Sequence, residues 1–502
     1  MKETAHRRPK RFGRPLNFRT ARATLSFGAV LLTAAGLLAA QTRPPHRTRY
    51  LSYEEAKPIL EAEAEILPPG LRGKSPSEMD RDWPGWVARR DAEIRARLAQ
   101  GDADTVVNFL LFGTSYTKRP RVTQKLIQQA GQPQSDAASA GPDPALAGLA
   151  ESLRGRADDL IRALAAPGNN DRLLFVRRLL AEQKGLRLDT PGGREQARDY
   201  LLANVGKVLG EYNSYAKILA AARAQGASEE FIERSSIFRT RGLSSDTTLL
   251  PNFAVEEALK AISARGLLSA GGVRRVAIIG PGLDITDKQE GYDFYPLQSI
   301  QPFAVIDTLL RLGLARTGEL QITTLDLSPR VNEHLRQARL RAQRGQGYML
   351  HLPYDTEAGW TPEAVRYWER FGDRIGKPAA PAAPPLNAGA VKMRAVLVRP
   401  PVVSSVTPAD ANIVLQRPDL PASERYDLII ATNILVYYDT FEQSLAVANI
   451  ERVLRPGGFL LSNNAVLELP FSRVRAVDYS TVAYSDRPGD GDHIVWYQRA
   501  AD

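Results

Sequence analysis

The sequence predicts a mixed α/β protein with a mostly parallel sheet in its C-terminal half and helices in its N-terminal half. From residue 273 onward, short β-rich apolar runs alternate with helical patterns, as expected for βαβ units. From about residue 51 to residue 266, apolar residues recur near i, i+3 and i+4 instead. A basic, then apolar N-terminus precedes both regions. We therefore divide the chain into residues 1–45, 46–250 and 251–502.

The first 45 residues are typical of a signal peptide or signal anchor. Residues 1–22 carry eight Lys/Arg and one acid, Glu3. The stretch "ATLSFGAVLLTAAGLLAA" (23–40) follows without a charge. Its length is at the lower end of what spans a bilayer, roughly 17–25 residues. This segment predicts a chain that is anchored in a membrane or exported to the cell envelope; a buried helix is the alternative.

Residues 41–50 are typical of a linker, and an all-α region follows. Helices are expected at residues 54–67, 85–101, 171–185 and 196–226, with a break at 131–144 rich in Gly, Pro and Ser.

Strands and helices then alternate along the C-terminal region. Strands are expected in "VRRVAIIG" (273–280), "LQITTLDL" (320–327), "RAVLVRP" (394–400), "YDLIIATNIL" (426–435) and "GFLLSNN" (458–464). Helices are expected at 302–313, 329–344 and 440–454. Two last strands, 480–486 and 492–499, flank "RPGDG" and predict an antiparallel edge hairpin. The Pro/Ala-rich stretch 376–390 is expected to be an exposed loop. Together these elements predict a Rossmann-like, doubly wound sheet.

Composition excludes several kinds of site. The net charge is +10, but the basic leader accounts for most of it, so the remainder has no basic footprint for nucleic acid. There is no cysteine, which rules out disulfides and thiolate chemistry. The five histidines are not spaced as metal ligands, and we expect no metal site.

The stretch "VAIIGPGLDITDKQEGYDFYP" (276–296) is unusual. An apolar run ends at Gly280-Pro281-Gly282, where glycines permit positive φ and close backbone approach to a ligand. The helix that should follow at once is delayed by a detour that carries Tyr292, Phe294 and Tyr295.

Acids follow two further strands. Asp326 ends the run "LQITTLDL", where a carboxylate can accept hydrogen bonds from ribose hydroxyls. The alternative is a helix start, which Ser328-Pro329 would serve better. Asp410 lies in "TPADANIV", where it can accept an adenine amino group while the N–H of Ala411 meets a ring nitrogen. A solvated loop acid is the alternative there.

The strand "YDLIIATNILVYYD" (426–439) carries the remaining candidates. Asn433 follows its buried part, and Tyr437, Tyr438 and Asp439 come next. These last three are the candidate catalytic residues, should the reaction need a base.

Taken together, these segments resemble the class I S-adenosylmethionine-dependent methyltransferases over about residues 250–502. "VAIIGPGLD" looks like the glycine motif of that family, "TTLDLS" its ribose acid, "PADA" its adenine contact, and "VLRPGGFLLSNN" its fifth strand. Residues 433–458 are most similar to the chemotaxis-receptor O-methyltransferases. The usual third glycine is replaced by Leu283-Asp284.

The resemblance implies a methyltransferase of the EC 2.1.1 class with S-adenosyl-L-methionine as donor. The residues expected to contact this donor are Gly280, Pro281, Gly282, Asp326, Leu327, Asp410, Ala411 and Asn433. The acceptor, a small molecule or a protein, stays open. The membrane is expected as a partner through the N-terminal helix if that helix is not cleaved.

Two other functions compete with this one. A catalytically silent module with the methyltransferase fold at the cell envelope would explain the eroded glycine motif and the leader. A nicotinamide dehydrogenase would need glycine at position 285, which is Ile285, and would not have the edge hairpin. The aromatic detour either closes over the donor, lines the substrate or packs on the helical region.

Overall fold

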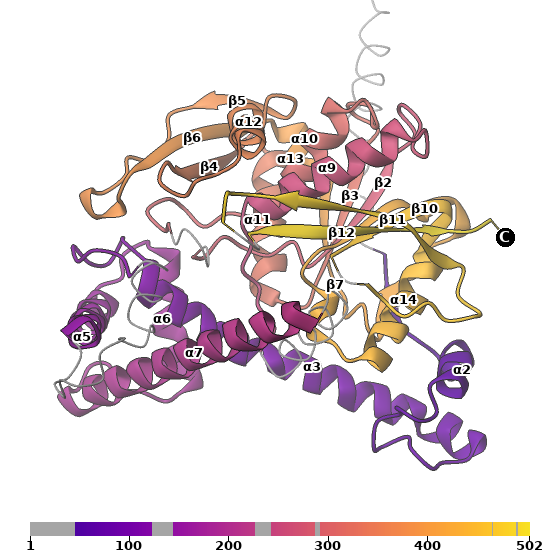
Figure 1. The fold of residues 1–502 in the computed structure, drawn as a ribbon, viewed down its shortest axis with the longest axis horizontal. Helices are drawn as coiled ribbons and strands as arrows, with labels where there is room; N and C mark the ends of the chain where they lie inside the picture. Colours follow the sequence, from indigo (N-terminus) through magenta and orange to yellow (C-terminus); the bar gives the residue numbers. More distant parts are fainter. Residues whose placement is uncertain are drawn as a thin grey trace, which may run out of the picture. The chain divides into compact units, whose positions relative to one another are not determined.

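The computed structural model describes residues 46–122, 144–225, 242–286, 292–463, 465–487 and 490–501 (Figure 1). The chain divides into two units, Met1–Pro45 and His46–Asp502, and the described residues all belong to the second. The predicted signal or anchor segment lies outside them. None of the described helices is long and apolar enough to cross a membrane.

A seven-stranded, mostly parallel sheet organises the C-terminal half. Its order is β11-β12-β10-β9-β2-β3-β7. The strands are β2 (Arg275–Ile279), β3 (Gln321–Asp326), β7 (Val406–Asp410), β9 (Tyr426–Ala431), β10 (Leu454–Ser462), β11 (Val474–Ala483) and β12 (Gly491–Arg499). All pairs from β10 to β7 are parallel, whereas β12 runs antiparallel to both β10 and β11. The predicted α/β class, parallel sheet and edge hairpin are therefore confirmed.

Helices cover both faces of the sheet. α9 (Leu250–Ala264) precedes β2, and α10 (Gln301–Arg311), α11 (Pro329–Gln343), α13 (Pro400–Ser404) and α14 (Thr440–Val453) lie in the connections between the parallel strands. Side chains alternate along β2: Val276 and Ile278 join the core beneath α9 and α10, while Ala277 and Ile279 join the core beneath α14. This alternation is the period of two that a strand imposes.

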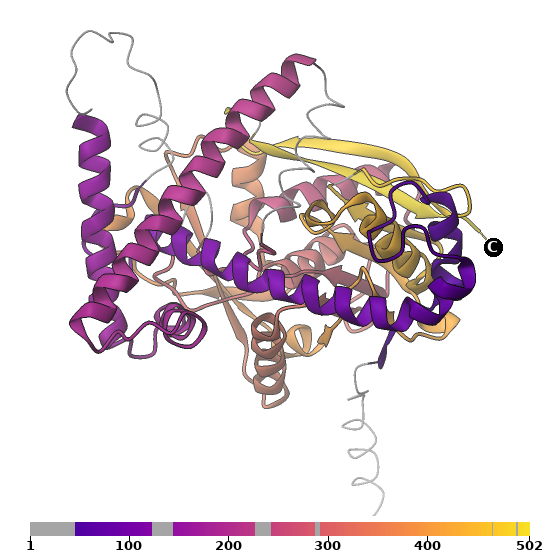
Figure 2. The same cartoon turned by 90° about the horizontal axis from the view of Figure 1, so that it is seen from below.

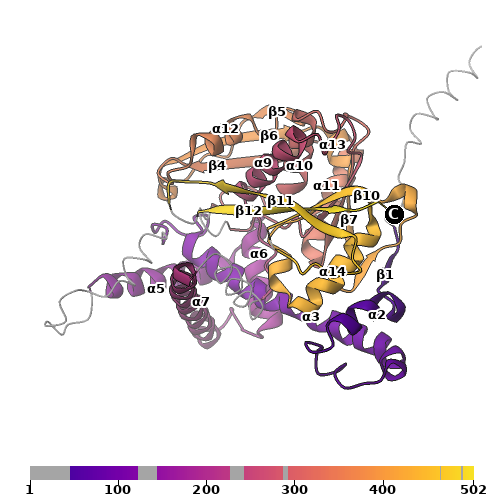
Figure 3. The same ribbon diagram turned by 45° about the vertical axis from the view of Figure 1, so that its right-hand side comes forward.

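A second, three-stranded sheet is inserted between α11 and β7. It consists of β4 (Tyr348–Asp355), β6 (Val391–Val398) and β5 (Gly376–Ala379), all antiparallel, and α12 (Pro362–Arg370) lies beside it (Figure 3). The strand predicted at 394–400 exists as β6, but its placement among the parallel strands is wrong, because it pairs with β4 and β5. The predicted loop 376–390 is likewise corrected, since β5 forms its first part.

The N-terminal half contributes helices and one short strand. They are β1 (Thr48–Tyr50), α2 (Tyr53–Ala62), α3 (Pro76–Phe112), α5 (Pro144–Ala165), α6 (Asp171–Arg178) and α7 (Pro191–Gln225). β1 pairs with β8 (Gln416–Pro418), so residues 48–50, predicted as linker, are a strand instead. The C-terminal part of α3 packs with α5, α6 and α7 in a core of their own.

The long helix α3 belongs to two cores. Trp83, Trp86 and Ile94, in its first half, pack in the core beneath α14, whereas Phe109 and Phe112 pack in the helical core. Ser75 caps its N-terminus through a capping box with Glu78, which satisfies two otherwise free backbone donors. Figure 2 shows α3 as one continuous helix that runs from the α2 side to the α5–α7 side.

Candidate functional site

The order of the sheet marks one place for a ligand. From β2 the chain continues to β3 and β7 on one side, and then returns to β9 on the other side of β2. In open α/β sheets, ligands bind at the carboxyl ends of the strands beside such a reversal. The candidate site is therefore the carboxyl edge formed by the ends of β7, β3, β2 and β9.

The glycine turn after β2 is tightly enclosed. Gly280 and Gly282 both have a φ of 66°, which glycine adopts without strain. A Cβ on Gly280 would lie 2.1 Å from Ile434 Cδ1, and one on Gly282 would lie 2.9 Å from the carbonyl oxygen of Ser245. Pro281 between them is buried. Both glycines are thus required by backbone conformation and by close packing, independently of any ligand.

The residues that replace the third glycine have a structural role. Leu283 is fully buried with Val331 and Leu335 of α11, and its N–H donates to the Ser245 carbonyl over 2.7 Å. Thr247 in turn donates its N–H to the Leu283 carbonyl. The segment before α9 therefore pairs with the residue that follows the glycine turn, through these two backbone hydrogen bonds.

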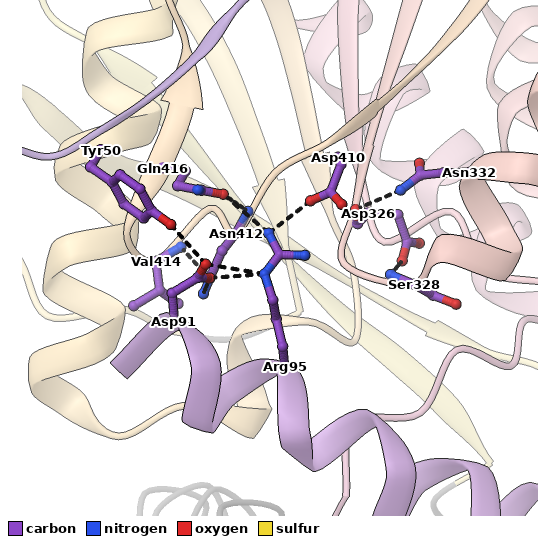
Figure 4. Close-up of polar contacts among 10 residues, drawn as sticks. All are labelled: Tyr50, Asp91, Arg95, Asp326, Ser328, Asn332, Asp410, Asn412, Val414 and Gln416. Atoms are coloured by element: carbon purple, nitrogen blue, oxygen red, sulfur yellow. Dashed lines mark hydrogen bonds and ion pairs between the residues drawn. The ribbon is translucent and has the colours of Figure 1, made fainter. Parts of the chain in front are cut away.

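Asp326, the predicted ribose acid, lies at the end of β3 but is only 7% exposed. Its Oδ1 accepts the N–H of Ser328 over 2.7 Å (Figure 4). Burial raises the pKa of Asp326 to about 6, although backbone hydrogen bonds from Ser328 and Gly282 and the charge of Arg330 act in the opposite direction. Ser328 is the N-cap of α11, as the alternative interpretation of this stretch expected.

The neighbours of Asp326 connect it to the helical part. Leu327 is half-buried against the core beneath α14. Arg330 donates to Asp102 of α3 over 3.0 Å and to the hydroxyl of Ser245 over 2.9 Å. The β3 end is thereby tied both to α3 and to the segment that covers the glycine turn.

Asp410, the predicted adenine acid, ends β7 and is the register partner of Asp326 on the adjacent strand. Its side chain is 52% exposed, and Arg95 of α3 donates to its Oδ1 over 2.7 Å (Figure 4). The N–H of Ala411, which we expected to face a ring nitrogen, points to the Asp326 carbonyl over 3.4 Å, a long contact. The two predicted acids therefore lie side by side in contrasting surroundings.

Asn433 follows β9 in a left-handed conformation, with a φ of 58°. Its N–H donates to Asn463 Oδ1 over 2.7 Å, and the amide of Asn463 donates back to Asn433 Oδ1. The preceding residue, Thr432, accepts from Gln301 at the start of α10 over 2.9 Å. These amides connect the ends of β9 and β10 and the helix that begins after the detour.

The three candidate catalytic residues are held in the fold. Tyr437 and Tyr438 are buried in the core beneath α14, and burial raises the pKa of Tyr438 well above its usual value. Arg97 of α3 donates to the carbonyl of Tyr437 over 2.7 Å. Asp439 is the N-cap of α14 and forms a capping box with Glu442. A neutral buried tyrosine and a capping carboxylate are poorly suited to take up a proton.

The aromatic detour packs inward. Tyr292 and Tyr295 are buried, and they pack with Ala388 while Phe294 packs against them. Residues 287–291 lie outside the described part of the chain. These contacts bring the three aromatic residues against the inserted sheet. Arg121 and Arg172 of the helical half lie over the rings of Tyr292 and Tyr295, which is part of what the packing alternative expected.

Asp293 fixes the detour to the turn after α3. It is 2% exposed, and its carboxylate accepts the N–H and the hydroxyl of both Thr114 and Ser115. Arg172 of α6, also buried, donates to the carbonyls of Asp284, Ile285 and Tyr295. The turn after α3 thus binds the detour through Thr114 and Ser115.

Sequence patterns did not reveal the role of α3. Asp91 and Arg95 contact the β7 end, Arg97 the β9 end, and Asp102 the helix after β3. Charged residues are frequent along this predicted helix, and charged residues on a helix are usually solvated, so the sequence does not distinguish these four from exposed charges.

No family model matches this chain, and no curated protein does. Among solved structures, it is similar to the N-methyltransferase NodS from Bradyrhizobium japonicum WM9, at 14% identity and a TM-score of 0.25, over 49% of this chain and 98% of that one. It is also similar to the magnesium protoporphyrin IX methyltransferase ChlM from Synechocystis PCC 6803, at 11% identity and a TM-score of 0.24, over 54% and 83% of the two chains.

A third similar structure is a TehB-like S-adenosylmethionine-dependent methyltransferase from Corynebacterium glutamicum ATCC 13032, at 10% identity and a TM-score of 0.23, over 50% and 98% of the chains. At such scores these similarities establish neither the fold nor the activity of this chain. Any proposal for the function therefore depends on the strand order and on the contacts at the carboxyl edge.

Proposed function

We propose that this chain is an S-adenosylmethionine-dependent methyltransferase whose donor binds at the carboxyl ends of β2, β3, β7 and β9. One observation supports it above all: the segments that resemble the donor motifs lie together at the reversal of the strand order. Asp326 and Asp410 lie opposite each other in register on adjacent strands.

The residues present suit the chemistry of the donor. The carboxylate of Asp326, largely ionised at neutral pH, is an acceptor for ribose hydroxyls. One oxygen of Asp410 has no partner among the described residues and can accept the adenine amino group. Gly280 and Gly282 allow the backbone to approach the amino-acid part of the donor.

Methyl transfer is an in-line displacement at the carbon bound to the sulfonium. The chain would orient donor and acceptor and exclude water. A base is needed only for an acceptor that must lose a proton. Among the described residues, no group of three or more His, Asp or Glu side chains is placed to hold a metal ion.

A specific observation favours the silent binding module as the second candidate. Arg95 occupies one oxygen of Asp410, Asn463 occupies the amide of Asn433, and Ser245 lies against Gly282. If these internal contacts persist in solution, few groups at the carboxyl edge are left to bind the donor.

Equilibrium binding separates the candidates. Calorimetric titration of the protein with S-adenosylmethionine should give saturable binding, and titration with NAD should give none. Asp326→Ala should weaken donor binding about 10- to 150-fold, because a hydrogen bond to a charged group contributes about 1.5–3 kcal/mol. A wild-type protein that does not bind S-adenosylmethionine at all would contradict the methyltransferase proposal and leave the silent module.

The finer proposals concern location and acceptor. We propose that residues 1–45 target the protein to the membrane or the cell envelope, so their deletion should shift it to the soluble fraction. If the truncated chain turns insoluble while the full chain stays soluble, the segment is part of the core. The likeness of residues 433–458 to receptor methyltransferases supports the reaction class, and no acceptor follows from it.

A further inference from the structure

Arg95 comes from the helical half of the chain and reaches the acid that the methyltransferase resemblance assigns to adenine. One of its terminal nitrogens donates to Asp410 Oδ1 over 2.7 Å and to Gln416 Oε1 over 3.3 Å. Its Nε donates to both oxygens of Asp91 over 3.1 Å. Figure 4 shows the guanidinium lying between Asp91 and Asp410.

Asp91, whose carboxylate binds Nε of Arg95, is itself held in place. Asp91 is 7% exposed and accepts from the hydroxyl of Tyr50 over 3.0 Å and from the amide of Asn412 over 2.8 Å. Asn412 follows β7 by two residues, and its N–H donates to Gln416. The guanidinium is therefore fixed by β1, by its own helix and by the loop that carries Asp410.

Asp410 by contrast is held from one side only. Oδ1 is bound by Arg95, while Oδ2 has no partner among the described residues and the side chain is 52% exposed. A half-exposed carboxylate without a partner samples several rotamers, and fixing it in advance lowers the entropy lost on binding. Exposed ion pairs contribute little to folding, so stability alone is a weak explanation for this arrangement.

We propose that Arg95 is a positioning residue for adenine recognition: it holds Asp410 so that the free oxygen accepts the 6-amino group of an adenosyl ligand. This inference rests on the proposed function and deepens it. It gives the helical half a role in ligand selection, since the residue that orients the acid lies more than 300 positions before it in the chain.

The test compares two ligands that differ at position 6 of the purine. S-adenosylhomocysteine carries the 6-amino group, whereas S-inosylhomocysteine carries at position 6 an oxygen, which cannot donate to Asp410, and has its hydrogen on N1 instead. The wild-type protein should prefer the first about 10- to 150-fold. Arg95→Ala should lose most of this preference through weaker binding of the adenosyl ligand, with binding of the inosyl ligand nearly unchanged.

Three variants sharpen the interpretation. Asp410→Ala should abolish the preference, and adding Arg95→Ala to it should cause no further loss, because both residues act on one contact. Arg90→Ala is the matched control: Arg90 lies on the same helix and pairs with Glu442 of α14 over 2.8 Å, away from Asp410. That variant should keep the wild-type preference, and thermal melting should show that all variants are folded.

Two results would overturn the role of Arg95 while leaving the proposed function intact. Tighter or unchanged binding of S-adenosylhomocysteine by Arg95→Ala would mean that the ion pair blocks Asp410 or has no effect on it. An equal loss for both ligands would mean a merely structural role. If the wild-type protein binds neither ligand, the proposed function fails, and this inference fails with it.

Discussion

Helix α3 and the turn after it meet the carboxyl edge of the sheet at two polar junctions that differ in burial. The Arg95 junction consists of Tyr50, Asp91, Arg95, Asp410 and Gln416. Tyr50 is 44% exposed in it, and the side chain of Asp410 is 52% exposed. The Asp293 junction consists of Thr114, Ser115, Arg172, Asp293 and Tyr295, and Arg172 and Asp293 in it are only 2% exposed.

The two junctions differ in how easily their side chains can rearrange. The buried carboxylate of Asp293 accepts four hydrogen bonds, and it cannot move without leaving the two buried donors of Thr114 unpaired, which costs about 1–3 kcal/mol each. A half-exposed ion pair can open into water at a cost of about 1 kcal/mol or less. The Asp293 junction therefore fixes the detour to the turn after α3, whereas at the Arg95 junction the half-exposed carboxylate of Asp410 stays accessible to a ligand.

The largest effect is expected from replacing Tyr292, Phe294 and Tyr295 together by Ala. Truncating a buried aromatic residue costs about 3–5 kcal/mol, so losing two buried tyrosines approaches the whole stability of a typical domain. Chemical denaturation should show a protein that is unfolded or barely stable. Tyr479→Ala is the control, since Tyr479 is 58% exposed and its loss should change stability by about 0.5 kcal/mol at most. A stable triple variant with impaired ligand binding would show that the detour acts on the ligand instead.

Asp293→Ala tests the buried junction itself. It leaves two backbone N–H groups and two hydroxyls without their acceptor, and should lower the free energy of unfolding by about 3–5 kcal/mol. Asp293→Asn keeps one acceptor oxygen and should fall between wild type and Ala in urea titrations. A loss below about 1 kcal/mol for Asp293→Ala would remove the proposed contrast between the junctions.

Asp326, on the same edge, should make ligand binding depend on pH. Its ionised form accepts the ribose hydroxyls, so S-adenosylmethionine affinity should rise as pH increases through about 6 and level off near neutrality. Below that pH the affinity should fall by up to about tenfold per unit. Asp326→Asn should give weaker binding without this transition, and an unchanged pH profile in that variant would exclude Asp326 as the group responsible.

The same carboxyl group affects stability with the opposite sign. Its pKa in the folded protein is about 6, above the ordinary 3.8, so the folded ligand-free protein keeps a proton that the unfolded chain releases. This contribution to stability is present below pH 4 and is lost as pH rises through 6, by an amount on the order of 3 kcal/mol. In urea titrations between pH 4 and pH 7, the free energy of unfolding of wild type should therefore fall with rising pH relative to that of Asp326→Asn.

The smallest effect is expected from removing one tyrosine hydroxyl at the Arg95 junction. The matched comparison removes one tyrosine hydroxyl at the Asp293 junction. Tyr50→Phe removes a hydroxyl that donates to Asp91 from a residue 44% exposed, and should cost about 0.5 kcal/mol, because water can replace it. Tyr295→Phe removes a buried hydroxyl that donates to Asp284, and should cost about 1–3 kcal/mol. Equal losses in thermal and urea unfolding would mean that burial does not distinguish the two junctions.

Local patterns in the sequence were sufficient for the elements that form the site. The apolar runs of β2, β3 and β9, the cap at Ser328 and the hairpin of β11 and β12 all depend on residues a few positions apart. Gly280 and Gly282, Asp326, Asp410 and Asn433 were accordingly located at strand ends from the sequence. Whether they bind the donor remains a prediction.

Tertiary structure decided what surrounds those residues. A strand pattern does not specify its partners, which is why β6 was predicted among the parallel strands although it pairs with β4 and β5. The raised pKa of Asp326 comes from burial, and the ion pair of Asp410 comes from a helix 315 residues away in sequence. Burial and long-range charge pairing depend on which distant segments meet, and a single sequence records the residue types without recording those meetings.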